Sequence, residues 1–162
     1  MTAAIALPHR LPYAIRLGGV GDVAFVMDAW MQSERDASGH LEGRHFIRWQ
    51  KRMQRDILAR DTTRVVVAAP EGDPETILGW LVYSETQPQV IYYAYVRDQA
   101  RRMGIASALL AAAGLSPAEE VFYSARPARV RSQVEGIWTS APVVARLPAA
   151  WRYQPRAAYL EP

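Results

Sequence analysis

The order of hydrophobic and polar positions predicts five β-strands and three α-helices before residue 125. Apolar and polar residues alternate in the predicted strands, whereas apolar residues recur every three or four positions in the predicted helices. In the first helix, Val23, Val26, Met27 and Trp30 follow the i, i+3, i+4, i+7 spacing of one buried face. The predicted strands are 13–17, 63–69, 76–84, 89–96 and 120–124, and the predicted helices are 22–32, 44–60 and 107–113.

Turn and cap residues separate these elements. Asp22 is predicted to be the N-cap of the first helix, and the polar stretch 33–43 to be a loop. A turn around Gly72 joins the second and third strands into a hairpin, and Gly114 ends the last helix. The length of 162 residues suits one domain, and 50% hydrophobic with 22% charged residues is typical of a globular protein. We therefore expect a single domain, 1–162.

The segment between the fourth strand and the third helix has the composition of an anion-binding turn. Arg101 and Arg102 precede Gly104, and a helix-like run begins at Ser107. Glycine lets the backbone approach a ligand closely, while the free N–H groups and the dipole at a helix N-terminus favour phosphate. The sequence contains neither a P-loop nor the three spaced glycines of a dinucleotide fingerprint. Phosphate binding is therefore predicted from a helix terminus.

Segment 96–110 resembles the acyl-CoA-binding motif of the GCN5-related N-acetyltransferase (GNAT) family. The motif reads Arg/Gln-x-x-Gly-x-Gly/Ala, and Arg101, Gly104 and Ala106 fill it, five residues after Val96 closes the strand. The resemblance implies an α/β (α+β) fold in which a mixed, mostly antiparallel sheet is flanked by helices. It also implies an acyltransferase that moves an acetyl or other acyl group from acetyl-CoA to a primary amine by direct attack.

The resemblance also implies which residues bind acetyl-CoA, the acyl-donor substrate. In the family, the amides of the motif bind the CoA pyrophosphate, and the backbone at the strand's end pairs with pantetheine. The backbone N–H of Val96 is the expected hydrogen-bond donor to the thioester oxygen. The alternative is that Gly104 and Ala106 only allow close helix packing. The expected cofactor-binding residues are Val96, Arg101, Arg102, Met103, Gly104, Ile105, Ala106 and Ser107.

The group that deprotonates the amine is not at the family's common position. Many members have a glutamate on the motif strand, about six residues before the valine, where this chain has Gln89 and Val90. Deprotonation then goes through water, goes through Glu34 in the polar stretch 33–43, or is not required.

Ser124 and Tyr92 are the other candidate catalytic residues. Tyr123 and Ser124 end the strand beside the motif strand, and alternation sends their side chains to opposite faces. Because family members often have a small polar residue there, Ser124 is favoured for protonating the departing thiolate, with Tyr153 as a more distant option. The alternative is a Ser124 hydroxyl bonded to nearby backbone. Tyr92 is expected to share the sheet face of Val96 and to line the acceptor site.

The chain departs from the family after Ala125. Prolines at positions 127, 142, 148 and 155 interrupt any long helix, so only a short helix near 143–147 and an extended segment 151–159 are predicted. Arginines in this part alternate with tyrosines and tryptophans, a composition that suits phosphate contacts and base stacking. A nucleic-acid-binding or nucleic-acid-modifying protein is therefore a second hypothesis, less favoured because it explains only this part. A CoA-binding protein without catalysis is the third.

The composition also bears on disulfides, metal sites and membrane spans. The chain has no cysteine, which excludes disulfides and a thiolate nucleophile, and its three histidines lack the spacing of a zinc site, so no metal is expected. No apolar run approaches the roughly 18 residues of a membrane span, and residues 1–12 contain prolines and a histidine instead of a signal-peptide core. We expect a cytoplasmic protein without membrane contact. The acceptor and the oligomeric state, a homodimer included, stay open.

Overall fold

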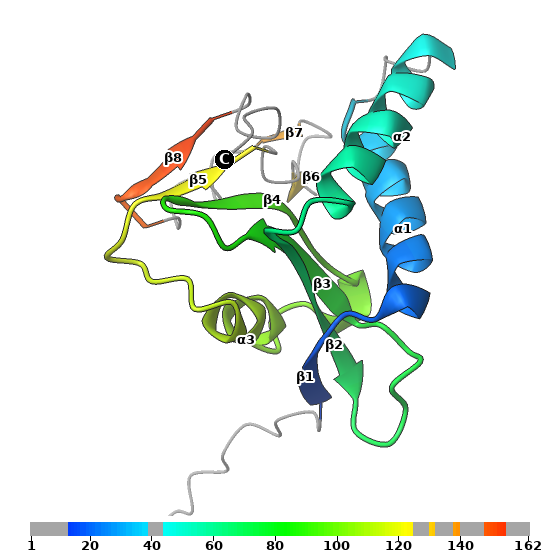
Figure 1. Cartoon of the computed structure of the whole chain (residues 1–162). Helices are drawn as coiled ribbons and strands as arrows, with labels where there is room; N and C mark the ends of the chain where they lie inside the picture. The colour runs from blue at the N-terminus through cyan, green and yellow to red at the C-terminus, as the bar shows by residue number, and fades with distance from the viewer. Residues whose placement is uncertain (1–12, 39–43, 125–129, 132–137, 140–147, 155–162) are drawn as a thin grey trace, which may run out of the picture.

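The computed structural model describes residues 13–38, 44–124, 130–131, 138–139 and 148–154, and it describes side chains for 13–33, 47–124 and 148–154 (Figure 1). The described helices are α1 (Val20–Ser38), α2 (Arg44–Leu58) and α3 (Ile105–Ala112), with the short 3-10 helix η1 (Asp98–Ala100). The described strands are β1 (Tyr13–Leu17), β2 (Thr63–Pro70), β3 (Gly79–Ser84), β4 (Gln89–Val96), β5 (Val121–Tyr123), β6 (Val130–Arg131), β7 (Trp138–Thr139) and β8 (Trp151–Tyr153).

Six of these strands form one mixed sheet in the order β1-β2-β3-β4-β5-β8. Neighbouring strands from β1 to β4 are antiparallel, whereas β4, β5 and β8 are parallel to one another. Strands β6 and β7 make a separate antiparallel pair. This arrangement confirms the expected α/β class with a mostly antiparallel sheet.

Helices cover both faces of the sheet, α1 and α2 on one face and α3 on the other (Figure 1). On the first face, Trp30 of α1 and Ile57 of α2 pack with Trp80 of β3. On the second face, Ile105 and Leu109 of α3 pack into a cluster with other residues of the strands. All five side chains are almost completely buried, and each contributes roughly 1.5–3 kcal/mol by leaving water. Two cores therefore share one sheet, because successive strand residues point to opposite faces.

Helix α1 begins earlier and ends later than predicted. Asp22 is not the N-cap but the third helical residue: its carboxylate accepts the backbone N–H of Gly19 at 2.7 Å and pairs with Arg16 at 2.6 Å. An acid three residues after the cap satisfies a backbone donor in the same way as in a capping box. The expected loop at 33–43 is wrong for 33–38, which are helical. No glycine or proline occurs between Ser33 and Ser38 to stop the helix.

The other predicted elements lie close to their observed bounds. The predicted strand 89–96 coincides with β4, and the hairpin of β2 and β3 forms with Gly72 at φ 83° in the turn between them. The extended segment expected at 151–159 is a strand over 151–153. The short helix expected at 143–147 and the rest of that segment after 154 lie outside the described residues.

Candidate active site

The turn after β4 brings a helix terminus without a side-chain cap to the surface. Gly104 is the N-cap of α3, with φ 78° and no side-chain cap, and its carbonyl accepts the first bond of the helix from the Ala108 N–H at 3.0 Å. The backbone N–H groups of Ile105, Ala106 and Ser107 therefore have no acceptor within the helix. Ile105 is 1% exposed, so its side chain fixes the helix start against the sheet while these amides stay at the surface. A left-handed glycine makes this geometry unstrained.

The two arginines of the turn have different surroundings. Arg101 donates from Nε to the carbonyl of Val96 at 3.3 Å and pairs with Asp98 at 2.8 Å, so its guanidinium ties the turn back to the strand. Arg102 is exposed, has φ 65°, and forms no ion pair with any described residue. Both arginines were expected to bind phosphate. Arg102 has its whole guanidinium available for that role, whereas Arg101 also shapes the turn.

The end of β4 has an edge that no described strand pairs with. The Arg97 N–H donates to the carbonyl of Leu78 at 2.8 Å, so alternation points the peptide groups of Val96 and Ala94 away from β3. On that side, β5 pairs with β4 only along 89–91. The two parallel strands thus separate before β4 ends, and Ala94 to Val96 have no strand partner on that edge among the described residues.

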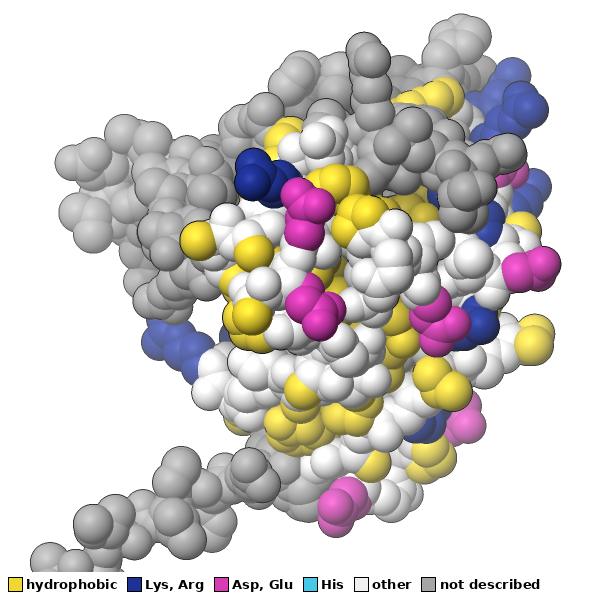
Figure 2. Space-filling model, turned by 60° about the vertical axis from the view of Figure 1, so that its left-hand side comes forward, with side chains coloured by type: hydrophobic (Ala, Val, Ile, Leu, Met, Phe, Trp, Pro, Cys, Tyr) yellow, Lys and Arg dark blue, Asp and Glu magenta, His cyan; other side chains and the backbone are white. Residues whose placement is uncertain are grey.

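An apolar slot of about 110 Å³ lies between this edge and α3. It reaches the first turn of α3, where the free amides are, and its lining has almost no polar surface. Figure 2 shows hydrophobic side chains on the face of the molecule that lies at the left in Figure 1. The lining residues are Ala94, Tyr95, Val96, Ala106, Leu109 and Leu110.

A β-bulge turns Tyr92 away from this slot. Val82 pairs with Tyr93, but Tyr83 pairs with Ile91, so Tyr92 is an extra residue without a partner in β3. Tyr92 therefore packs in the cluster beneath α1 and α2. Its hydroxyl accepts a hydrogen bond from Arg60 at 3.2 Å.

The expectation that Tyr92 shares the face of Val96 is wrong, because the inserted residue shifts the alternation by one. Val96 packs in the cluster on the α3 face. Tyr92 instead lies on the opposite face of β4, where Tyr93 shares a 2.6 Å hydrogen bond with Ser33.

Ser124 lies where β4 and β5 separate. Its N–H donates to the carbonyl of Ile91 at 3.0 Å, and its hydroxyl donates to the carbonyl of Tyr92 at 3.3 Å. The backbone thus holds the hydroxyl at the fork, the point where β4 and β5 separate, as one of the two interpretations expected. The hydroxyl oxygen can still accept a hydrogen bond from another donor. Tyr123 packs on the α3 face, with its ring 5.5 Å from that of Tyr153. These two tyrosines stabilise the β5–β8 edge.

The candidate base Glu34 lies on a helix, whereas the position of the family's glutamate lies on strand β4. Glu34 belongs to helix α1, not to a loop, and its side chain is outside the described residues. Gln89, at the position of the family's glutamate, donates its amide to the carbonyl of Ala113 at 3.3 Å and supports the C-terminal end of α3. Burial raises the pKa of Tyr83, with Glu85 as a second cause, so this phenol stays protonated at neutral pH.

Two further features of the described ranges concern metal binding and membrane spans. No group of three His, Asp or Glu side chains there could hold a metal ion. None of the helices there is long and apolar enough to cross a membrane.

The comparisons with known proteins agree with this geometry. No family model matches the sequence, and no curated protein matches it either. In contrast, 51 chains of solved structures match. One is a protein from Pyrococcus furiosus named as a candidate acetyl transferase, with 18% identity and a TM-score of 0.52. The match covers 76% of this chain and 85% of that one.

Two other solved structures match at lower TM-scores. A GNAT-family protein from Staphylococcus aureus is 14% identical, with a TM-score of 0.47 over 61% of this chain and 86% of that one. The fold is that of GNAT acetyltransferases. An aminoglycoside acetyltransferase from an uncultured soil metagenomic sample, solved with sisomicin, is 20% identical, with a TM-score of 0.48 over 85% of this chain and 88% of that one. The match to the Pyrococcus furiosus protein confirms the GNAT-type fold expected from segment 96–110.

Proposed function

We propose that this protein transfers an acetyl group from acetyl-CoA to a primary amine. The observation that carries the proposal is the continuity of an apolar slot with a helix terminus: the slot follows the open edge of β4 and reaches α3 at Ala106. CoA has the same order of groups, a thin arm with two amides joined to a pyrophosphate. A slot with an uncovered peptide edge fits the arm, and free amides at a helix N-terminus fit the pyrophosphate.

The proposed contacts to the donor follow from this fit. The amides of Gly104 to Ser107 would hold the pyrophosphate, helped by the helix dipole and by the fork-shaped guanidinium of Arg102. The peptide groups of Ala94 and Val96 would pair with the pantetheine amides as an added strand does. The acetyl group would then lie near the fork between β4 and β5.

The proposed reaction divides three tasks among groups at this fork. A neutral amine nitrogen attacks the thioester carbon from the face of β4 opposite α3, the face on which Tyr92 lies. A backbone N–H on the open edge of β4, nearer to the fork than the pantetheine contacts, stabilises the charge that develops on the oxygen. The carbon–sulfur bond breaks, and the thiolate takes a proton from water, either directly or through the hydroxyl of Ser124, which regains its own proton from water in the same step. Glu34 or a water molecule removes the proton of the attacking amine.

Ligand-dependent melting tests the donor without knowledge of the acceptor. A ligand that binds only the native state at a hundred times its Kd stabilises it by about 2.7 kcal/mol, which raises the Tm by about 5–11 °C for a domain of this length. Acetyl-CoA and CoA should both give this rise, whereas adenosine and NAD should give little. Millimolar acetyl-CoA without any shift would refute the proposal.

Release of the CoA thiol tests the transfer step. Spermidine, kanamycin and a peptide with a free N-terminus present three kinds of primary amine, and at least one should accelerate thiol release. A full thermal shift with no release for any amine would instead favour a CoA-binding protein without catalysis.

A further inference from the structure

The side chain of Arg101 lies against the open edge of β4. Its Nε donates a hydrogen bond to the carbonyl oxygen of Val96 at 3.3 Å, and its Nη2 pairs with the carboxylate of Asp98 at 2.8 Å. The short helix η1 brings these groups together, because the Arg101 N–H donates to the carbonyl of Asp98 at 3.3 Å. One guanidinium thus joins the end of the strand to the turn that precedes α3.

The Val96 carbonyl is also a group that the proposed contacts to pantetheine require. The peptide groups of Val96 and Ala94 point away from β3, and both residues line the apolar slot. An arm that pairs with this edge as a strand does needs the carbonyl as a hydrogen-bond acceptor in the plane of the sheet. The Arg101 guanidinium already lies at that carbonyl. The arm and the guanidinium therefore compete for one position.

The contacts that hold Arg101 are weak enough to be exchanged. The side chains of Arg101 and Asp98 are 53% and 80% exposed, and an exposed ion pair stabilises a protein very little. The 3.3 Å bond from Nε is also longer than the usual N–H···O distance of about 2.9–3.0 Å. A pyrophosphate at the N-terminus of α3 offers the same guanidinium charged oxygens, which accept its N–H groups in pairs.

We propose that Arg101 changes partners when CoA binds. An amide N–H of the arm replaces Nε at the Val96 carbonyl, and the guanidinium turns to the pyrophosphate. Asp98 is then a positioning residue that acts through Arg101, because its carboxylate holds the guanidinium at the edge. A ligand that must first displace a side chain binds with an affinity reduced by the fraction of protein in the open state, so Asp98 lowers the affinity for CoA. This inference rests on the proposed function, because it uses the proposed path of the arm.

Two fragments of CoA test the exchange, because they separate the arm from the phosphates. Pantetheine contains the arm alone, and ADP contains the pyrophosphate without the arm. In Arg101→Ala the Val96 carbonyl is free, so the Kd of pantetheine should fall about two- to fivefold, the effect of losing a weak exposed contact. The Kd of ADP should rise about three- to tenfold, because a charged hydrogen-bond donor is lost. NMR titration of the backbone amides measures both constants.

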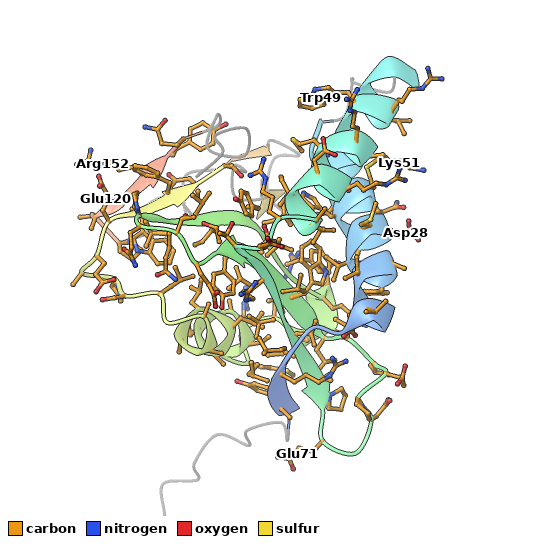
Figure 3. The ribbon with its side chains drawn as sticks, in the orientation of Figure 1. Asp28, Trp49, Lys51, Glu71, Glu120 and Arg152 are labelled. Carbon is orange, nitrogen blue, oxygen red and sulfur yellow. The ribbon has the colours of Figure 1, made fainter. Side chains whose placement is uncertain are left out.

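The opposite signs are specific to the exchange. A role of Arg101 in phosphate binding alone predicts an unchanged Kd for pantetheine, and a damaged turn predicts weaker binding of both fragments. The matched control Arg152→Ala removes another exposed arginine that pairs with a carboxylate, and it should leave the Kd of pantetheine unchanged. Its partner is Glu120, and Figure 3 shows the two side chains together at the left-hand edge, where the sheet ends with β8.

Asp98→Asn tests the positioning residue by calorimetry with CoA. The Kd should fall about two- to fivefold, because the guanidinium is no longer held, and Asp98→Glu should restore the Kd of the parent. In the Arg101→Ala background the same substitution should leave the Kd unchanged, because no guanidinium remains to be released. Glu120→Gln removes an equal charge from the other exposed pair and should also leave it unchanged.

Three outcomes would overturn the proposal. The first is pantetheine that binds Arg101→Ala no better than the parent, or not at all. The second is an equal gain from Asp98→Asn with and without Arg101, which would mean that the carboxylate only repels the phosphates. The third is a parent protein that does not bind CoA, which would refute the proposed acetyl-CoA site as well. The first two outcomes, in a parent that binds CoA, refute the exchange and leave the proposed function standing.

Discussion

Filling the apolar slot is the sharpest test of where the cofactor binds. Ala94 is exposed on the open edge of β4 and lines the slot of about 110 Å³. The substitution Ala94→Phe adds a phenyl ring where the pantetheine arm would pass. Because the side chain is exposed and aromatic residues are favoured in strands, the melting temperature of the ligand-free protein should change little.

The expected loss follows from binding linkage. At a concentration of acetyl-CoA a hundred times the parent's Kd, the parent should gain about 2.7 kcal/mol and melt about 5–11 °C higher. If Ala94→Phe raises the Kd a hundredfold, the same concentration gives only about 0.4 kcal/mol, or about 1–2 °C. Differential scanning fluorimetry with and without ligand resolves this difference.

A matched control separates the slot from a general effect of an added ring. Ala59, exposed just after α2 on the far side of the sheet, receives the same change in Ala59→Phe, which should keep the full thermal shift. A folded Ala94→Phe variant that also keeps the full shift would show that acetyl-CoA does not occupy the slot, whatever its other contacts.

Four other substitutions test the remaining parts of the argument. Gly104→Glu places a carboxylate at the N-terminus of α3, where the nearest described atom to a new Cβ is the Tyr13 hydroxyl at 3.8 Å. Calorimetry should detect no CoA binding to this variant. The free energy of unfolding should fall by about 1–3 kcal/mol, because a side chain is strained at φ 78°. Ser124→Ala should lower the turnover number more than it changes the Kd of acetyl-CoA, if the hydroxyl serves the thiolate. Gln54→Leu should raise the free energy of unfolding in urea by about 1 kcal/mol or more, because Nε2 and Oε1 of this 0% exposed side chain have no hydrogen-bond partner among the described residues. Asp22→Asn should lower the free energy of unfolding by about 1 kcal/mol at pH 7 and by almost nothing well below pH 4. The hydrogen bond from Arg16 lowers the pKa of Asp22 in the folded state. The stability that the Asp22 carboxylate contributes is therefore present above its unfolded pKa of about 4 and is lost as the pH falls through the folded pKa.

Each of these tests has a result that would contradict it, and Gly104→Glu also has a matched control variant. Gly114→Glu, at φ 69° after the other end of α3, carries the same strain and charge and should leave CoA binding intact; equal loss in both glycine variants would point to damaged structure. Unchanged turnover in Ser124→Ala moves the acid role elsewhere. A lower melting temperature for Gln54→Leu would mean that its amide has structural hydrogen-bond partners. A pH-independent cost for Asp22→Asn would assign its effect to geometry, not charge.

The sequence predicted the order of elements because each carries a strong local signal. The strand over 89–96 is apolar throughout most of its length and is bounded by Pro88 and by the polar turn at Asp98, so both ends were evident. The third helix was predicted to begin at Ser107, and it begins two residues earlier, at Ile105, directly after the N-cap Gly104. The turn between β4 and α3 could therefore be placed to within a residue or two.

The bulge at Tyr92 could not be predicted in this way. No glycine or change of composition marks it, and the run Ile91, Tyr92, Tyr93 suits either face of a strand. Pairing with β3 decides which residue is the extra one, and that depends on contacts distant in sequence. The same limit applies to the slot, whose walls come from β4 and α3 and whose opening depends on where β5 stops pairing.

The early separation of β5 from β4 also determines how long an edge of β4 another chain can pair with. An unpaired strand edge is a template on which another chain can add a strand and begin to aggregate. Here the stretch without a partner strand among the described residues runs only from Ala94 to Val96, because β5 pairs with 89–91 and the chain turns into η1 soon afterwards. A strand of ordinary length, about five or six residues, finds too few partners there, whereas a ligand arm with two amides needs no more. The short opening thus excludes long peptide strands by length alone and leaves the edge to small molecules.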